Sequence, residues 1–349
     1  MRPLQIDDIL HIMKRHQFTW TPLLRAGFLL YMLLVCSYSQ ADWFKDEQAI
    51  MGTIIRVELW HTDKGRAKLA INRVMGEMRR IDSMMSPYKT TSMLSQINRE
   101  AANHPVGINQ ELFELIEKSL YFSTLTHGAF DITYASVGRF YNYRNRIYPT
   151  NSQINKNINK INYKHIYLNQ KNHTISYALK GVFIDLGGIA KGYAVDRSIK
   201  LLKNMGIQNA IVTAGGDSRI IGDKRGRPWI IGIRDPRKAR SVKGMIPLVD
   251  SALSTSGDYE RYFIKDGEHY HHILNPKTGR SAKQLRSVTV IGPDATTTDA
   301  LSTSVFVLGP VKGMALINRL PGIEAVLIDQ QNKLIYSSGL LARGNQGKK

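Results

Sequence analysis

Residues 184–195 (IDLGGIAKGYAV) combine residue types that suit the binding of an anion. An apolar strand is expected to end at Asp185, to pass through the glycine pair 187–188 and to enter a helix near Lys191. Two consecutive glycines let backbone amides approach an anion closely, because no Cβ stands in the way. The helix start adds the positive end of its dipole. The segment therefore favours a phosphorylated ligand over a neutral one.

A second candidate lies in residues 296–303 (TTTDALST). If a helix begins there, Asp299 and Thr303 are four residues apart and lie on one face. A carboxylate and a hydroxyl on one face form half of a hard-oxygen site for Mg²⁺, which keeps several waters and takes further ligands from phosphates. The competing interpretation is that Asp299 only caps the helix, where Thr and Asp are favoured anyway. From spacing alone, the capping interpretation is the stronger one.

The paired histidines His271 and His272 suit a general base better than a metal site. Adjacent strand residues point to opposite faces, so the two rings would not share an ion. One histidine facing a pocket suits proton transfer because its pKa lies near neutrality. The hydroxyls of residues 254–257 (STSG) could hold phosphate oxygens or could simply end a strand. A Ser-His-Asp hydrolase stays open, although the GxSxG elbow is missing, as are a P-loop and GxGxxG.

The composition indicates a globular protein with an unusually basic surface. The 349 residues suit one large domain or two smaller ones, and 43% hydrophobic residues are enough for a sizeable core. The net charge is +20, and residues 1–41 hold four basic and two acidic residues, so the remainder carries about +18. Anionic lipid, nucleic acid or a phosphate-rich ligand would each explain this charge, as would a generally basic surface; we expect no nucleic acid.

The N-terminus predicts a signal peptide at residues 1–41 and therefore export. An apolar stretch at residues 26–36 follows basic residues and precedes small residues at 39–41 that suit a signal peptidase. The stretch is too short to span a bilayer comfortably. Met13 offers a later start. Cys36, the only cysteine, offers a lipidation site, and cleavage before residue 42 would leave no thiol.

Strand and helix patterns alternate irregularly along the rest of the chain, which indicates an α+β fold in one compact domain, residues 42–342. Strands are expected at residues 53–59, 210–213, 229–233, 287–291, 324–327 and 334–337. Helices are expected at residues 67–85 and 110–125, after the glycine pair as far as residue 205, and after residues 296–299. Residues 139–164 read as a basic, asparagine-rich surface excursion, and residues 343–349 as a disordered tail.

Nine segments in this order resemble the ApbE-type FAD:protein FMN transferases, exported enzymes of the bacterial envelope. They are residues 51–53, 86–98, 130–133, 184–192, 214–217, 229–236, 254–257, 272–279 and 298–303. Only the excursion at residues 139–164 and Ile132, where the family usually has proline, depart clearly. The resemblance implies a single ApbE-like domain related to the T-fold.

The resemblance also implies an activity and a site. The family splits FAD at its pyrophosphate with Mg²⁺ and transfers FMN through a phosphoester to a Thr or Ser of a target protein, releasing AMP. By matching position, the implied metal ligands are Asp299, Thr303 and backbone near Gly188 and Ala190, which reverses the capping interpretation. The implied FAD contacts are Met51, Tyr88, Ala129, Phe130, Asp131, Asp185, Lys191 and Leu274. His272 is the candidate base for the acceptor hydroxyl.

Several functional alternatives stay open at this stage. A Mg²⁺-dependent FAD pyrophosphatase would release FMN and AMP to water, and a periplasmic FAD-binding protein would do no chemistry, although it would not need a metal site. By resemblance, the acceptors are subunits of Na⁺-translocating NADH:quinone reductase or Rnf-type complexes. We expect a periplasmic location, with association at the surface of the inner membrane.

Overall fold

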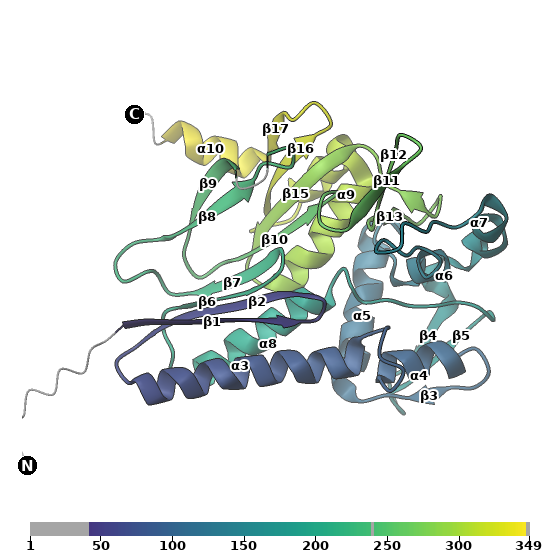
Figure 1. Ribbon diagram of the computed structural model, residues 1–349, viewed down its shortest axis with the longest axis horizontal. Helices are drawn as coiled ribbons and strands as arrows, with labels where there is room; N and C mark the ends of the chain where they lie inside the picture. The colour runs from purple at the N-terminus through teal and green to yellow at the C-terminus, as the bar shows by residue number, and fades with distance from the viewer. Residues whose placement is uncertain (1–41, 239–240, 347–349) are drawn as a thin grey trace, which may run out of the picture. The chain divides into compact units, whose positions relative to one another are not determined.

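An antiparallel sheet of eight strands is the central element of the structure (Figure 1). The computed structural model describes residues 42–238 and 241–346, and the compact unit that holds the sheet spans Asp42–Lys349. Each neighbouring pair of strands is antiparallel. In spatial order the strands are β1 (Asp42–Ile50), β2 (Thr53–His61), β6 (Ala210–Ala214), β7 (Asp217–Ile221), β10 (Ala252–Gly257), β15 (Leu285–Gly292), β16 (Glu324–Asp329) and β17 (Leu334–Tyr336).

The hairpin of β1 and β2 follows from its sequence pattern. Ile55, Val57 and Leu59 alternate along β2 and are fully buried, so one face of the strand joins the core. Met51 and Gly52, which connect β1 to β2, both have positive φ values, 55° and 67°. Two such residues make a turn whose twist matches that of the flanking strands. The strand expected at residues 53–59 is confirmed, as are the other five expected strands.

Three helices cover one face of the sheet: α3 (Lys64–Met85), α8 (Ala190–Asn204) and α9 (Ala295–Ile317) (Figure 1). The buried residues of α3 follow the helical spacing expected from the sequence. Helix α9 is long and apolar enough to cross a membrane, but over half of it is buried inside the protein. It is kinked at Gly309, whose φ is 79°, and Pro310 follows directly. Helices α3 and α9 therefore both contribute to the hydrophobic core.

The opposite face of the sheet is covered in part by a two-stranded ribbon, β8 (Trp229–Arg234) and β9 (Val242–Leu248). Trp229 and Leu248 of the ribbon pack on Ile220 and Leu253 of the sheet. Trp229 also meets Trp43 edge to face at 5.1 Å between ring centroids. The sheet is therefore buried on both sides near its middle.

A smaller layer holds α4 (Met93–Glu100), α5 (Gln110–Leu125) and a three-stranded sheet of β3 (Val106–Gly107), β5 (Thr174–Tyr177) and β4 (Ile166–Asn169). Helix α5 has the bounds expected from its apolar stripe. Asn109 caps it by accepting a hydrogen bond from the Leu112 N–H at 2.9 Å. This layer lies beside the far end of α3 in Figure 1.

Residues 139–164, expected as an excursion without periodicity, hold more structure than their composition indicated. After η1 (Ile132–Tyr134) and α6 (Ala135–Gly138) come α7 (Asn151–Asn157), η2 (Ile158–Lys160) and η3 (Tyr163–His165). Thr150 and Gln153 form a capping box at the start of α7. Tyr141 and Ile154 pack with Val137 and Leu274 in a separate apolar cluster. The segment is therefore anchored along its length.

The structure bears on the C-terminal end of the chain but not on the predicted signal peptide. The signal peptide expected at residues 1–41 lies outside the described residues. At the other end, α10 (Ser338–Gln346) extends four residues into the tail that was expected to be disordered from residue 343. Residues 347–349 again lie outside the described residues.

Candidate functional site

The first turns of α8 and α9 meet at the centre of the candidate site. The α8 N-cap, Ile189, offers no side-chain cap. Instead, Asp299 of α9 accepts a hydrogen bond from the Gly192 N–H at 3.0 Å, while Lys191 Nζ lies 3.4 Å from the same carboxylate. The positive end of α8 is thus directed at a buried carboxylate. The sequence predicted an anion-binding turn here, and in the structure the Asp299 carboxylate takes part of that anion position.

Asp299 does not cap its own helix. Asp294 does so by accepting from the Thr297 N–H at 2.8 Å, and Asp196 of α8 accepts from the N–H groups of Ala295 and Thr296 at 2.9 and 2.8 Å. The capping interpretation of Asp299 is therefore wrong for α9, because two other carboxylates already satisfy the free donors of its first turn.

Gly192 permits this close crossing of the two helices. A Cβ at Gly192 would lie 2.1 Å from the Ala295 carbonyl oxygen and 2.8 Å from Asp299 Cβ. No real Cβ tolerates such distances, so only glycine lets α8 approach α9 this closely. The glycine of the expected Lys-Gly helix start thus has a packing role.

Thr303 lies one turn further along α9 and faces the glycine turn. A Cβ at Gly188 would lie 3.3 Å from Thr303 Oγ1 and 3.2 Å from Phe130 Cε2. Ser256 Oγ lies 3.3 Å from Thr303 Oγ1 and shares a hydrogen bond with Ser302 Oγ at 2.9 Å. The structure therefore brings together Gly188, Thr303 and Phe130.

The strand expected to end at Asp185 is not formed, since residues 182–186 are paired with no strand in the described part of the chain. The side chain of Asn98 takes the place of a neighbouring strand: its Oδ1 accepts from the Ile184 N–H at 2.8 Å, and its Nδ2 donates to the Ile184 carbonyl at 2.9 Å. Because one buried amide satisfies both backbone groups, the segment holds its extended form without a ladder. Asp185 is thereby placed beside the glycine turn.

Asp185 closes the turn that follows it. Its Oδ1 accepts from the Gly187 N–H at 2.6 Å. Burial raises the pKa of Asp185, opposed by the Gly187 N–H and the Tyr134 hydroxyl. Tyr88 is 82% exposed and lies near enough to Asp185 for their charges to interact. An exposed aromatic ring thus stands at the mouth of the site, as expected for a residue that stacks on a planar ligand.

The two histidines differ sharply in their surroundings. His271, the last residue of β12 (Glu268–His271), is buried, and its Nε2 lies 2.7 Å from the Ala282 carbonyl oxygen, so it is a structural residue. His272 Nδ1 is buried and has no hydrogen-bond partner within the part of the chain that the structure describes. Burial, with the nearby charge of Arg261, lowers the pKa of His272 to about 3. His272 is therefore an uncharged imidazole with an open nitrogen.

The remaining residues predicted to contact FAD include buried apolar side chains and one carboxylate that is already hydrogen-bonded. Ala129 and Phe130 are buried beside the glycine turn, and Leu274, in β13 (Leu274–Asn275), is buried in the cluster with Tyr141. Asp131 is already engaged: Oδ1 accepts from the Thr133 N–H at 2.8 Å and Oδ2 from the Tyr163 N–H at 2.9 Å. The Asp131 carboxylate therefore acts first as a fold-stabilising group.

Met51 lies in the β1–β2 turn, and Arg261 links that turn to the site. Arg261 Nη2 lies 3.4 Å from the Gly52 carbonyl oxygen, and the His272 N–H donates to the Arg261 carbonyl at 3.2 Å. A shallow pocket of about 520 Å³ is lined by the turn, including Met51, and by Asp82. The sequence reasoning did not single out Arg261, which has no motif of its own.

Asp217 is a second residue that the sequence reasoning did not assign. It ends the Ala-Gly-Gly-Asp segment, is buried, and accepts a hydrogen bond from Lys191 Nζ at 2.5 Å. Lys191 thus bridges Asp217 and Asp299. Burial, together with the charge of Asp217, raises the pKa of Asp299 to about 7, while Lys191 opposes the shift. The two carboxylates raise the pKa of Lys191, so it stays charged.

The donor set fits a hard cation more closely than a transition metal. No group of three His, Cys, Asp or Glu side chains comes together among residues 42–238 and 241–346. Asp299 and the Thr303 hydroxyl instead offer only oxygens, which are the ligands that Mg²⁺ prefers. Within the described part of the chain, the Asp299 carboxylate contacts Lys191 and Gly192 through Oδ2. Its Oδ1 is thus the oxygen left for a cation.

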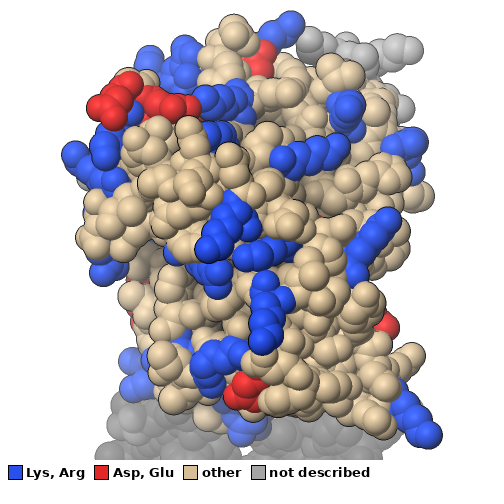
Figure 2. Space-filling model, turned by 90° about the vertical axis from the view of Figure 1, so that its right-hand side faces the viewer, with Lys and Arg blue, Asp and Glu red and all other residues tan. Residues whose placement is uncertain are grey.

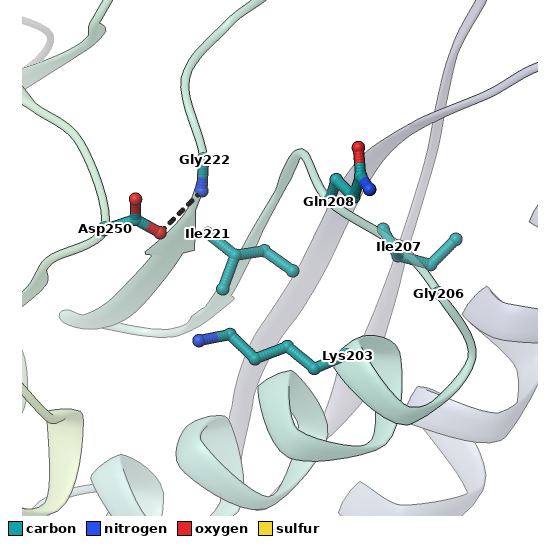
Figure 3. A pocket seen from close by; sticks show the side chains of 7 residues that line it. All are labelled: Lys203, Gly206, Ile207, Gln208, Ile221, Gly222 and Asp250. Carbon is teal, nitrogen blue, oxygen red and sulfur yellow. Dashed lines mark hydrogen bonds between the residues drawn. The ribbon is translucent and has the colours of Figure 1, made fainter.

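A separate pocket of about 390 Å³ lies at the far end of α8 (Figure 3). The Lys203 side chain extends toward Ile221 there, and Asp250 accepts from the Gly222 N–H at 2.8 Å. The Asp250 carboxylate is already used in this turn, and Lys203 is exposed. None of the residues predicted for the site lines this pocket, so we assign it no chemistry.

Comparison with known proteins places this geometry in a family. The model of the ApbE family matches residues 51–327. The FAD:protein FMN transferase of Treponema pallidum is 29% identical over 88% of this chain and 89% of its own length, and that of Vibrio cholerae 32% identical over 79% and 84%.

Solved structures agree with the sequence relatives. The crystal structure of the ApbE protein of Thermotoga maritima superposes with a TM-score of 0.80 at 36% identity, covering 86% of this chain and 99% of that one. The flavin transferase ApbE of Vibrio cholerae gives 0.77 at 28% identity with the same coverage. The expected α+β fold in one compact domain is confirmed. The chain therefore belongs to the ApbE family and is an enzyme of the FAD:protein FMN transferase type.

Proposed function

We propose that this protein transfers FMN from FAD to a Thr or Ser hydroxyl of an acceptor protein in a Mg²⁺-dependent reaction that releases AMP. The observation that carries the proposal is the pair of oxygen donors Asp299 and Thr303 on α9, with the α8 N-terminus at Asp299 and Gly188 beside Thr303. The family resemblance adds backbone near Gly188 and Ala190 as further ligands. A bound Mg²⁺ would neutralise the charge that develops on the two phosphates of FAD as their bridge breaks.

The residues of the chain divide the remaining tasks. The positive end of the α8 dipole would favour the phosphates of FAD beside the glycine turn. Lys191 stays charged between Asp217 and Asp299, so it adds a fixed positive charge to the same region. Tyr88 offers an exposed ring for the flavin.

His272 suits the role of general base. The acceptor oxygen attacks the phosphorus of the FMN half, and the bond from that phosphorus to the bridging oxygen breaks. AMP leaves with the bridging oxygen, and the hydroxyl proton passes to the imidazole of His272. Its buried Nδ1 has no hydrogen-bond partner among the described residues and is therefore open to accept this proton.

We further propose where this reaction takes place. Export by the signal peptide would put the enzyme in the periplasm, at the surface of the inner membrane. The acceptors would be subunits of membrane redox complexes, such as Na⁺-translocating NADH:quinone reductase or Rnf-type assemblies. Both proposals rest on the family resemblance and on the N-terminal sequence.

The test is incubation of the protein with FAD, Mg²⁺ and a candidate acceptor domain, followed by intact mass and in-gel flavin fluorescence. We expect a fluorescent acceptor and AMP. FMN and AMP without a labelled acceptor would mean that the enzyme is a pyrophosphatase, and unchanged FAD would mean that it only binds the nucleotide. Asp299→Asn should abolish turnover, whereas Asp294→Asn, which keeps a cap in the same turn, should retain it.

A further inference from the structure

The surface next to the site carries a strong and uncompensated positive charge. Residues 132–184 hold eight Lys and Arg residues and no Asp or Glu. Figure 2 shows the side of the molecule where α6, α7, β4 and β5 lie in Figure 1, and Lys and Arg are spread across it with few acidic residues among them. We define the basic surface as six exposed side chains: Arg139, Arg144, Arg146, Lys156, Lys164 and Arg280.

These six cations are not used inside the protein. None of them forms an ion pair within the described part of the chain. Arg139 lies over the ring of Phe183 at 4.6 Å, and Arg280 donates to Asn151 Oδ1 at 2.5 Å. Of the six, and among the described residues, only Arg280 lies near enough to an acidic group, Glu268, to lower the pKa of that carboxyl. Their charge therefore remains available to a partner.

The basic surface is attached directly to the walls of the site. Phe183, whose ring lies under the Arg139 guanidinium, is two residues before Asp185. The Tyr143 hydroxyl donates to the His271 carbonyl at 3.3 Å, next to the proposed base His272. The Tyr141 hydroxyl likewise donates to the Gly279 carbonyl at 3.0 Å. A macromolecule that presents a hydroxyl to His272 must therefore lie against or close to this surface.

We propose that the basic surface docks an acidic patch on the acceptor protein, beside the hydroxyl that receives FMN. This inference rests on the proposed function, because only protein transfer brings a macromolecule to His272. A lipid surface offers the same charge but has no reason to border the catalytic wall. Complementary charge of this kind guides encounter and orients the partner.

The test measures binding of two synthetic peptides of equal length to residues 42–349, the unit shown to hold its own sheet and core. Each peptide has a central threonine; the first is flanked by Asp and Glu, the second by Asn and Gln. The test variant combines Arg144→Gln, Arg146→Gln, Lys156→Gln and Lys164→Gln, none of which belongs to the proposed site. The control variant removes four exposed cations from α3, α8 and α9: Lys68→Gln, Arg73→Gln, Lys200→Gln and Lys312→Gln.

We expect the unmodified protein to prefer the acidic peptide, and the test variant to bind it about tenfold more weakly, since each exposed charge changes affinity by roughly twofold. The control variant should keep its affinity, and salt should weaken the preference. Equal binding of both peptides, or an equal loss in the control variant, would overturn the proposal. So would binding of phosphatidylglycerol vesicles through the four test residues without binding of the acidic peptide.

The outcome can be separated from that of the proposed function. FMN transfer by the unmodified protein is measured independently, as an acceptor mass gain. If transfer fails while the peptide preference holds, the proposed activity is wrong, and the surface binds acidic segments without serving an acceptor hydroxyl. If transfer succeeds while the preference is missing, only the docking surface is wrong.

Discussion

Gly192→Ala tests whether the crossing of α8 and α9 sets the geometry of the site. The new Cβ would lie 2.1 Å from the Ala295 carbonyl oxygen, whereas ordinary contact begins near 3.4 Å, so the helices must separate by about 1.3 Å. Overpacking of this kind costs about 1–3 kcal/mol. The hydrogen bond from Gly192 N–H to Asp299 is strained or lost, which costs about 1.5–3 kcal/mol more because its acceptor is charged.

The intrinsic preference of alanine for helices opposes this loss by about 1 kcal/mol. The net expectation is a fall in the free energy of unfolding of about 2–5 kcal/mol, together with a loss of AMP release because Asp299 is displaced from Thr303 and residues 188–190. Urea unfolding followed by circular dichroism measures the first, and nucleotide chromatography after incubation with FAD measures the second.

Gly76→Ala is the matched control, because Gly76 lies inside α3 and a Cβ there meets nothing within 4 Å. It should stabilise the protein by about 0.5–1 kcal/mol and leave AMP release unchanged. A Gly192→Ala variant with the stability and turnover of the unmodified protein would refute the account of the helix crossing. So would equal damage from both substitutions.

Three further predictions address single groups. In the folded protein the pKa of Asp299 is about 7, above its ordinary value of 3.8, so its contribution to stability is lost as the pH rises from 3.8 to 7. Because protons compete with Mg²⁺ for this carboxylate, the Kd for Mg²⁺ measured by calorimetry should rise about tenfold per pH unit below 7. A Kd independent of pH would contradict the ligand role. Asn98→Ala leaves the Ile184 backbone groups unpaired and should cost about 3 kcal/mol or more in urea unfolding; a loss below about 1 kcal/mol would count against the amide's double role. His272→Gln should lower kcat for transfer by about 10²–10⁴ with the KM for FAD unchanged, and a variant with normal kcat would remove His272 from the role of base.

The sequence was most informative where a local pattern and a packing requirement coincide. Helix α5 has the predicted bounds because an apolar stripe and the Asn109 cap act together. The six expected strands are present for a similar reason, since alternation along a strand such as β2 must match burial on one face of the sheet.

The sequence was less informative where distant groups replace local ones. The residues leading to Asp185 have the pattern of a strand, but the partner of Ile184 is the side chain of Asn98, 86 positions away. The α8 N-terminus receives its cap from Asp299 and not from the preceding residue. No local pattern can reveal such partners, because they exist only once the helices have packed.

The site shows the same limit. Residue types and spacing indicated a phosphate-binding turn and a hard-oxygen half-site, yet favoured a simple cap for Asp299 until the resemblance was considered. The link from Asp217 through Lys191 to Asp299 joins three separate motifs and was not foreseen. The only local signal for Asp217 was its place directly after Gly215 and Gly216, at the start of a strand. Its role became visible only from its contact with Lys191.

The central claim is that Asp299, Thr303 and the glycine turn hold the cation that splits FAD for transfer to a protein hydroxyl. Its most direct test is the intact mass of a purified acceptor domain after incubation with FAD, Mg²⁺ and either the unmodified protein or Asp299→Asn. The account predicts an acceptor heavier by one FMN phosphoester, with one AMP per label, and no label with the variant or without Mg²⁺. An acceptor labelled equally well by Asp299→Asn would contradict it.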